Sequence, residues 1–434
     1  MKNSKRKVLL GVLIVLVLCI GLFMKNKTNT LNNSSIHQES VVKKVDDNLI
    51  GAYIQEGEEY VKIDTIPTNG YEFNEEKSYC KIGDVIQEST TLSYDMDTQT
   101  LTVSPITKEG MKCYLYFDEK ASAGETILAQ EGGVETIKAK GTPDFSKTAT
   151  TDEGMYAAED DWGTSYYYRG AVNDNWLQFG TNSNGQALYW RIIRINGDGS
   201  IRLIYNGTST SQAGDRVMIN TNHVFNSSPI DNMYVGYMYQ SGQVHGLQTN
   251  SNIKTTIDNW YASNLADESE YLNGAVGFCG DRYPSTNYSS SNGSGGTGNA
   301  STFYGAFIRQ VSGKNPSFKC TDSQDLYTAT GSSKGNEALI YPIALISADE
   351  VAFAGGVYGS SNSSYYLYIN VYYWTMTPSS YTGNAYTFTV GLNGALLAPY
   401  VASTHGVRPV INIRSDVSLT GSGTTSDPFK LSVE

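Results

Sequence analysis

The feature that most constrains this chain is an uncharged apolar run from Val8 to Met24, preceded by four basic residues within positions 1–7. At 1.5 Å per helical residue the run spans about 25 Å, slightly less than a hydrocarbon core of ~30 Å. It ends Gly-Leu-Phe-Met rather than at a small-residue cleavage site, so it does not resemble a cleavable signal peptide. We therefore expect a cytoplasmic basic tail (1–7), a single transmembrane anchor (8–24) and an extracellular remainder.

The composition excludes several classes of partner. The net charge is −12, and the basic residues are scattered along the chain. Both facts disfavour nucleic acid and simple electrostatic adhesion to anionic lipid. Charged residues make up 17% of the chain, while 43 Gly and 32 Tyr contribute much of the rest. Neutral polar and aromatic side chains therefore dominate the predicted surface.

Four of the five cysteines lie outside the predicted anchor, and they fall in two local pairs, Cys80 with Cys113 and Cys279 with Cys320. Four cysteines allow three pairings, and the domain break between the two pairs favours the local ones. Such disulfides would close long loops and stabilise the fold in an oxidising environment. They agree with a location on the cell surface.

Changes in sequence pattern divide the outer part into segments. Residues 25–50 contain too few apolar side chains to form a core and predict a stalk. Short alternating runs between turn residues predict a small β domain over 51–120. A stretch with Gly-Gly and Thr-Pro predicts a linker over 121–152, and residues 153–434 form a large C-terminal domain.

Local patterns in the C-terminal domain predict strands and a few helices. Two strand-like runs flank the turn sequence Asn-Gly-Asp-Gly (196–199), which predicts a hairpin. Apolar residues recur at helical spacing from Ile253 to Leu265. Ser347 and Glu350 form a capping-box pattern that predicts the start of a short helix. We therefore expect an α+β fold for this domain.

Longer strings resemble a known family. They are Tyr-Tyr-Trp-Thr-Met-Thr-Pro (372–378), Gly-Val-Arg-Pro-Val-Ile-Asn-Ile (406–413), Trp-Arg-Ile-Ile-Arg-Ile-Asn-Gly-Asp-Gly (190–199), Pro-Ser-Phe-Lys-Cys (316–320), Ile-Ser-Ala-Asp-Glu (346–350) and Gly-Met-Lys-Cys-Tyr-Leu-Tyr-Phe (110–117). Together they resemble membrane-anchored surface proteins of gut Gram-positive bacteria that end in a domain of unknown function. The resemblance covers most of residues 60–434. It implies a C-type-lectin-like core, distantly like formylglycine-generating enzymes.

Two activities associated with such a core lack their signatures here. Formylglycine-generating enzymes use a pair of metal-binding Cys near the C-terminus, and no Cys follows Cys320. The Glu-Pro-Asn or Gln-Pro-Asp triplet of calcium lectins is also absent. No two of the four His have the spacing of a metal site, so we expect neither a metal nor a cofactor.

The stretch from Gly355 to Ser403 is rich in Tyr, Ser, Asn and Gly, the residues of antibody paratopes. Tyr rings could also stack on sugar rings without any metal. The candidate ligand-binding residues are Tyr358, Asn362, Tyr365, Tyr366, Tyr368, Tyr372, Tyr381, Asn384 and Tyr386. The alternative is that individual tyrosines fill the core of a Tyr-rich sheet. A further hypothesis is that a retroelement diversifies this stretch.

The sequence contains neither a phosphate loop nor a His-Glu-x-x-His motif. The paired carboxylates do not require a catalytic role, since Asp349-Glu350 fits a helix cap and Asp160-Asp161 fits a solvated turn. We therefore predict a non-enzymatic adhesion protein that binds a glycan or protein ligand on host or neighbouring cells. The alternatives are a cell-wall enzyme and a structural envelope component.

Overall fold

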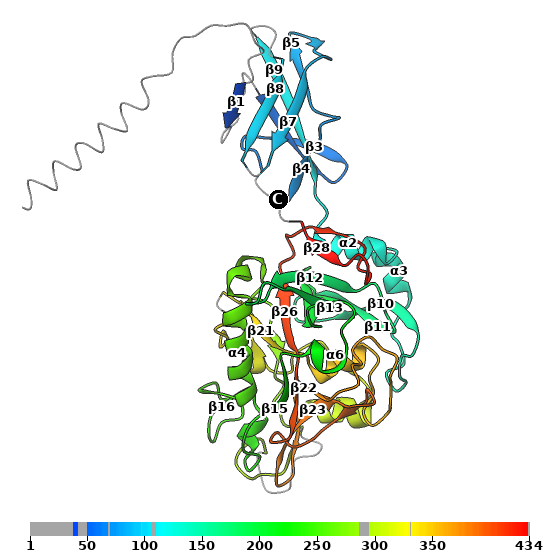
Figure 1. Cartoon of the computed structure of the whole chain (residues 1–434), viewed down its shortest axis with the longest axis vertical. Helices are drawn as coiled ribbons and strands as arrows, with labels where there is room; N and C mark the ends of the chain where they lie inside the picture. The colour runs from blue at the N-terminus through cyan, green and yellow to red at the C-terminus, as the bar shows by residue number, and fades with distance from the viewer. Residues whose placement is uncertain are drawn as a thin grey trace, which may run out of the picture. The chain divides into compact units, whose positions relative to one another are not determined.

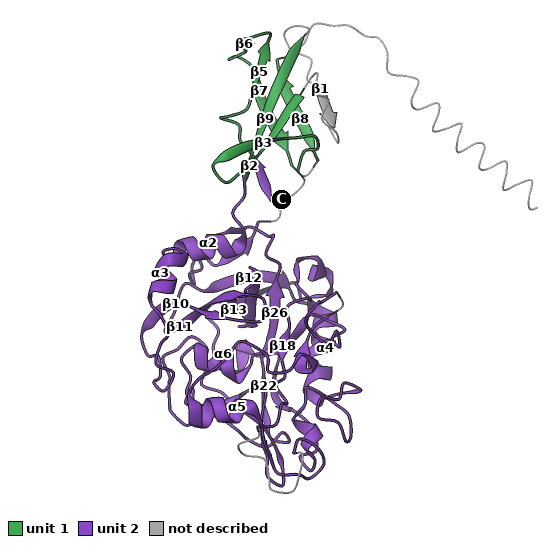
Figure 2. Cartoon of the chain, turned by 180° about the vertical axis from the view of Figure 1, so that it is seen from behind, with its two compact units in different colours: residues 1–68, 73–118 green, residues 69–72, 119–434 purple. Residues whose placement is uncertain are grey.

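The computed structural model describes residues 38–41, 50–67, 70–96, 98–105, 110–285, 295–329 and 331–432 (Figure 1). The chain forms two compact units (Figure 2). Unit 1 comprises residues 1–68 and 73–118, and unit 2 comprises residues 69–72 and 119–434. The predicted anchor over 8–24 lies outside the described residues.

Unit 1 is built from short strands. Its strands are β1 (Gln38–Val41), β2 (Ile50–Glu56), β3 (Glu59–Ile63), β5 (Tyr79–Ile82), β6 (Val85–Ile86), β7 (Thr91–Asp95), β8 (Thr100–Ser104) and β9 (Met111–Glu119), and β4 (Tyr71–Phe73) pairs with β9. One sheet has the order β3-β2-β9-β5-β6 and another the order β1-β8-β7. Alternation along β9 buries Cys113, Leu115 and Phe117 and leaves Tyr114 and Tyr116 partly exposed. The buried rings of Phe117 and Tyr94 meet edge to face between the two sheets.

Unit 2 contains, among the described residues, a nine-stranded sheet and a six-stranded sheet. The larger sheet has the order β21-β26-β14-β13-β12-β28-β27, with β11 paired to β13 and β10 to β11. Its strands are β10 (Asp152–Glu159), β11 (Thr164–Gly170), β12 (Trp176–Thr181), β13 (Ala187–Ile195), β14 (Ile201–Tyr205), β21 (Ile343–Leu345), β26 (Pro409–Ile413), β27 (Leu419–Thr420) and β28 (Phe429–Leu431). β13, β14 and β26 are almost completely buried and form the centre of the unit.

The six-stranded sheet has the order β15-β25-β22-β23-β24, with β19 paired to β22. Its strands are β15 (Asn220–Val224), β19 (Thr302–Phe303), β22 (Tyr373–Tyr381), β23 (Ala385–Val390), β24 (Leu396–Leu397) and β25 (Thr404–Val407). Two small pairs complete the β-structure: β16 (Met238–Tyr239) with β17 (Thr249–Asn250), and β18 (Phe278–Cys279) with β20 (Leu326–Tyr327).

The helical segments among the described residues are short. The α-helices are α2 (Ala123–Gln130), α3 (Val134–Ala139), α4 (Asn252–Asn264), α5 (Gly305–Phe307) and α6 (Ala348–Phe353). The other helical turns are η1 (Gly214–Val217), η2 (Asn232–Val235), η3 (Ala266–Tyr271), η4 (Ile308–Gly313) and η5 (Ser323–Asp325). α4 buries Ile253, Ile257 and Tyr261, as its sequence pattern predicted.

Other local predictions are confirmed. β13 and β14 form the predicted hairpin, in which Ile195 pairs with Ile201 and Gly199 takes a positive φ of 85° in the turn. The capping box at Ser347 and Glu350 is present at the start of α6. Both disulfides have the predicted pairing, Cys80 with Cys113 and Cys279 with Cys320.

The predicted fold class, α+β with a C-type-lectin-like C-terminal domain, is wrong: the described fold is mainly β, with 36% strand and 16% helix. The predicted helices exist but are short, and the apolar run that ends at Ile346 supplies β21, a strand. Within the described ranges, none of the helices combines the length and apolar character needed to cross a membrane.

Residues 121–152, predicted as a linker, instead contain α2 and α3 and belong to unit 2. Ser122 and Glu125 form a capping box at the start of α2, and the buried Ile127 and Ile137 anchor the two helices. The Gly-Gly pair at 132–133 ends one helix and begins the next, so it forms a tight turn. The sequence pattern had predicted a linker at these glycines.

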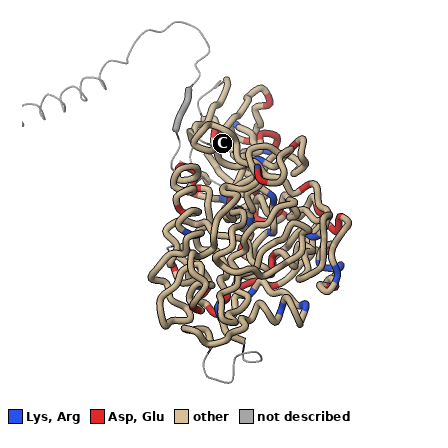
Figure 3. The backbone as a smooth tube through the Cα atoms, turned by 60° about the horizontal axis from the view of Figure 1, so that its bottom comes forward, with Lys and Arg blue, Asp and Glu red and all other residues tan. Residues whose placement is uncertain are grey.

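Charged residues are sparse along the backbone, and basic and acidic residues are interspersed (Figure 3). Several charges nevertheless lie deep in unit 2. Arg194, Arg202 and Arg408 are each at most 4% exposed. Such burial requires partners, since an unpaired buried charge is strongly unfavourable.

Candidate functional site

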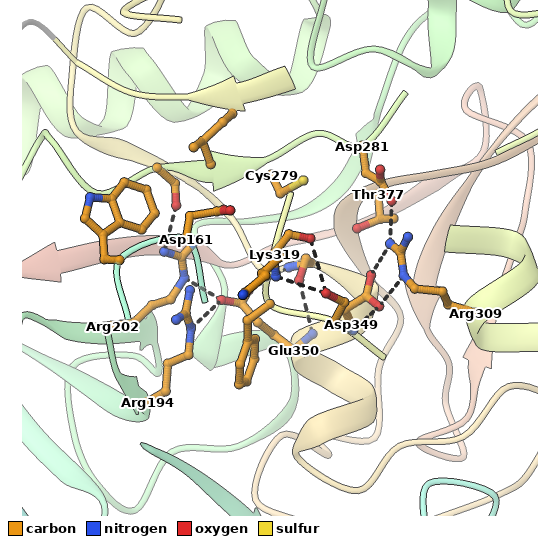
Figure 4. Close-up of a pocket in the computed structure, with 16 residues that line it drawn as sticks. Asp161, Arg194, Arg202, Cys279, Asp281, Arg309, Lys319, Asp349, Glu350 and Thr377 are labelled. Atoms are coloured by element: carbon orange, nitrogen blue, oxygen red, sulfur yellow. Dashed lines mark hydrogen bonds and ion pairs between the residues drawn. The ribbon is translucent and has the colours of Figure 1, made fainter. Parts of the chain in front are cut away.

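A polar pocket in unit 2 collects most of these buried charges (Figure 4). It has about 440 Å³ of space free of protein atoms, part of which is open to solvent. Arg194 and Arg202 enter from the hairpin β13–β14, Asp349 and Glu350 from α6, and Arg309 from η4. The pocket therefore lies where segments far apart in the sequence meet.

Glu350 is the centre of one ion network in this pocket. Its Oε1 lies 2.6 Å from Nε of Arg202 and 3.3 Å from Nε of Arg194. Its Oε2 accepts a hydrogen bond from the backbone N–H of Ser347. Arg194 also contacts Asp160 at 2.7 Å, and all these side chains are at most 5% exposed. Burial lowers the pKa of Arg202 to about 10, so its charge is retained at neutral pH.

Asp349 is the centre of a second network. Arg309 holds both carboxylate oxygens, at 2.9 Å from Nε to Oδ1 and 2.8 Å from Nη2 to Oδ2. Oδ1 also accepts hydrogen bonds from Gln310 and from the backbone N–H of Ser317. Arg309 pairs with Asp281 as well, whose pKa is raised because the carboxyl is buried. Both oxygens of the Asp349 carboxylate thus accept hydrogen bonds from the protein.

This arrangement holds the fold together, because each of the central carboxylates is held by an arginine and by backbone N–H groups. No described part of the chain brings together three or more His, Cys, Asp or Glu side chains that could hold a metal. Asp160, which the sequence analysis placed in a solvated turn, is buried and paired with Arg194. Sequence reasoning missed the pocket, although arginines inside apolar strands were a signal for buried partners.

Four of the nine predicted ligand-binding residues are buried: Asn362, Tyr365, Tyr366 and Tyr381. Tyr365 donates from its hydroxyl to the carbonyl of Gly394, and the Asn362 amide donates to the carbonyls of Ala149 and Gly355. The Tyr366 ring lies 5.3 Å from the buried Arg191 guanidinium. These side chains stabilise the interior and cannot form a ligand-binding surface, so this part of the predicted site is corrected.

The five remaining predicted residues, Tyr358, Tyr368, Tyr372, Asn384 and Tyr386, are partly exposed, but they do not form one cluster. Tyr372 stacks on His405 at the start of β22, with ring centroids 4.9 Å apart. Tyr368 donates from its hydroxyl to Asn370. Tyr358 packs edge to face on Phe388 in β23.

Tyr386 and Asn384 lie at the other end of β22–β23, where Tyr386 meets Tyr400. The two rings are 4.8 Å apart between centroids and inclined by 32°, and Tyr400 is 47% exposed. The N–H of Ala385 bonds to the carbonyl of Pro229, which brings Ile230, 67% exposed, to the same region. We call Tyr386, Tyr400, Asn384 and Ile230 the tyrosine-pair surface.

Buried contacts fix this surface in place. Tyr381 donates from its hydroxyl to the carbonyl of Ile230, at 3.0 Å, and to Oδ1 of Asn299. A β-bridge joins Tyr386 to Tyr400. The sequence analysis did not single out Tyr400, because its pairing with Tyr386 depends on the course of the chain after β24.

Both disulfides are closed, which indicates an extracellular or secreted protein. Comparison with known protein families, curated proteins and solved structures found no match for this chain.

Proposed function

We propose that this protein is an extracellular binding protein that recognises a glycan through the tyrosine-pair surface. The observation that supports the proposal is the ring contact between Tyr386, which is partly exposed, and Tyr400, which is 47% exposed, close to Asn384 in the chain. Aromatic rings with one apolar face and a polar edge suit stacking on sugar rings. An amide beside them can both donate hydrogen bonds to hydroxyl groups and accept hydrogen bonds from them.

The limited rotamer freedom of tyrosine favours binding at this surface. Tyr side chains offer a large contact area with few rotatable bonds, and Tyr386 is already held by its contact with Tyr400. Little conformational entropy is therefore lost when a ligand binds. A protein ligand would use the same atoms, and binding to a glycan array distinguishes the two.

The test is a glycan array probed with the purified full-length chain and with the double variant Tyr386→Ala/Tyr400→Ala. We expect the double variant to lose about tenfold or more in affinity, the loss of one to two aromatic contacts. Tyr283→Ala is the matched control, since Tyr283 is 43% exposed on a different segment. Equal binding by the double variant would contradict the site.

Two other results would contradict the class of protein. Binding to cell-surface proteins but to no glycan would replace the glycan by a protein ligand. Turnover of peptidoglycan by the wild type would make the protein a cell-wall enzyme. We do not extend the proposal to diversification by a retroelement, because several residues of that stretch, including Tyr365 and Trp374, fill the core.

Retention at the cell surface through residues 8–24 is a separate prediction from the sequence. Fractionation of cells tests it: the protein should sediment with membranes and be released by detergent but not by high salt. Recovery of the protein in the culture medium would show that it is secreted.

A further inference from the structure

Two buried arginines of unit 2 lie outside the ion networks of the polar pocket. Arg191, in β13, is 7% exposed, and Arg408, just before β26, is completely buried. Within the described ranges of the chain, neither guanidinium forms an ion pair with a carboxylate. Taking an unpaired charge out of water is strongly unfavourable, so both arginines require a compensating negative charge.

The hydrogen bonds of these two arginines go to neutral acceptors. Nε and Nη2 of Arg191 donate to the Asn175 amide oxygen and to the Val172 carbonyl, each at 2.6 Å. Arg408 also donates to three neutral oxygens, which belong to the carbonyls of Tyr205 and Leu367 and to the amide of Asn206. Burial, with a smaller effect of the Arg408 charge, lowers the pKa of Arg191 to about 9. Arg191 therefore remains charged at neutral pH.

Two further hydrogen-bond donors beside Arg191 have no acceptor. The centroid of the Trp176 ring lies 4.4 Å from Cζ of the guanidinium, and that of the Tyr366 ring lies 5.3 Å from it. Nε1 of Trp176 and the hydroxyl of Tyr366 are both buried, and neither makes a hydrogen bond within the described residues. An indole N–H can only donate. The group that would complete this cluster is therefore an acceptor.

The Tyr366 hydroxyl lies within electrostatic range of both arginines. Burial raises the pKa of Tyr366, and the positive charges of Arg191 and Arg408 oppose that rise. The backbone N–H of Tyr366 donates to the carbonyl of Gly170 at the end of β11. An acceptor bound here would therefore join the segment that precedes β22 to the larger sheet.

Two carboxylates act on this region without direct contact with either arginine. Asp174 is half-buried, which raises its pKa, and it acts on Arg191 from beyond ion-pair distance. Glu350 acts on the Tyr366 hydroxyl, but its charge is compensated by the two arginines of the polar pocket. Neither carboxylate accepts a hydrogen bond from Trp176 or Tyr366.

We infer that a small monovalent anion of the size of chloride binds beside Arg191, where it accepts hydrogen bonds from Trp176 and Tyr366 and compensates the buried arginines. The near-complete burial of these side chains excludes a large anion. A water molecule could accept the same hydrogen bonds, but it would leave both positive charges uncompensated. The inference does not depend on the tyrosine-pair surface, because the two sites share no residue.

Thermal unfolding of the full-length chain in mixtures of NaCl and sodium gluconate tests the inference. The ionic strength stays constant while chloride varies, and gluconate is too large for a buried site. Tryptophan fluorescence reports on unit 2, and its midpoint should rise by about 4 °C as chloride saturates the site. Bromide should replace chloride, and its anomalous scattering in a crystal should give a peak beside Arg191.

Conservative variants link this effect to the proposed site. Tyr366→Phe and Trp176→Phe each remove one donor and keep an aromatic ring, so the fold should be retained. Each should raise the chloride concentration that gives half of the shift by about tenfold. Tyr365→Phe is the matched control, because its buried hydroxyl already donates to the carbonyl of Gly394. It should lower the midpoint but leave the dependence on chloride unchanged.

Two results would overturn the inference. A wild-type midpoint that does not change with chloride would leave a water molecule as the acceptor. A chloride effect that Tyr366→Phe and Trp176→Phe both retain in full would place the ion elsewhere in the protein. Glycan binding by the tyrosine-pair surface is measured separately, so the two proposals can fail independently.

Discussion

Cys80 and Cys113 are register partners on β5 and β9, and the next pair along the same strands is the stacked Tyr79 and Tyr114. The disulfide and the ring stack thus hold the same two strands from opposite faces of the sheet. A covalent link in the buried layer fixes the register of the aromatic layer. Removal of the disulfide should therefore disturb both the buried side of the sheet and the stacked tyrosines on its other face.

Replacing both cysteines by alanine should destabilise unit 1 by about 4 kcal/mol, the chain-entropy estimate for a loop of 33 residues. All Trp residues lie in unit 2, so a near-UV circular dichroism transition in urea that occurs without a change in tryptophan fluorescence would report the unfolding of unit 1. Tryptophan fluorescence reports on unit 2 and should not change. As a control, Cys279→Ala/Cys320→Ala should destabilise unit 2, which the tryptophan fluorescence reports, and leave unit 1 unchanged. A tyrosine signal unaffected by the first variant would contradict the role of the bridge.

The sequence predicted local structure well wherever a short pattern determined it. The turn at 196–199, the capping box at Ser347 and the helical stripe from Ile253 each depend on neighbouring residues alone. The fold class was wrong because it depends on how strands far apart pair. β14, for example, lies between β13 and β26, and no local pattern encodes that order.

The candidate site also shows this difference between what local sequence predicts and what depends on contacts between distant segments. Composition indicated that Tyr and Asn between Tyr358 and Ser403 were numerous, but not which of them face solvent. Tyr365 is buried, and its hydroxyl donates to the carbonyl of Gly394, 29 residues away, so no local pattern reveals its environment. The alternation along β9 could have been found from the sequence, since Cys113, Leu115 and Phe117 are spaced to face a core and Tyr114 and Tyr116 to face away from it.

Glu350 compensates two buried arginines, so Glu350→Gln should destabilise unit 2 strongly. The variant leaves Arg194 and Arg202 with less negative charge, and we expect a loss of about 3–5 kcal/mol. Asp416→Asn is the control, because its pair with Arg414 is exposed and should contribute about 1 kcal/mol or less. Urea unfolding followed by tryptophan fluorescence measures both. Similarly small losses of stability in the two variants would show that Glu350 is not needed to stabilise the buried arginines.

His405 should make unit 2 less stable in acid. Burial beside Tyr372 and Trp374 lowers the pKa of His405 to about 4, below the 6.5 of an unfolded histidine. As the pH falls from 6.5 towards 4, the unfolded chain binds a proton that the folded chain does not, so this contribution to stability is lost. His405→Gln should be less sensitive to pH over that interval. Parallel stability curves for the wild type and the variant between pH 6.5 and 4 would contradict the prediction.

His245, in contrast to His405, should make unit 2 more stable at acidic pH than at alkaline pH. Its Nδ1 lies 3.0 Å from Asp325, and its Nε2 lies 3.7 Å from Asp322. The hydrogen bond to Asp325 raises the pKa of His245 above 6.5, although burial and Arg282 oppose the effect. The charged form therefore favours folding below pH 6.5, and its contribution is lost as the pH rises through the raised pKa.

The measurement compares the wild type with His245→Gln by urea unfolding from pH 6 to 9. The stability difference between them should be largest at the acidic end and shrink as the wild-type imidazole loses its proton. The loop of residues 240–248, which carries His245, should also exchange its amide hydrogens faster at pH 9 than the intrinsic pH dependence predicts. Since Asp325 is also held by Arg282 at 2.6 Å, the η5 segment itself should remain protected throughout. Loss of protection in η5 together with the loop would show that His245 stabilises the whole region.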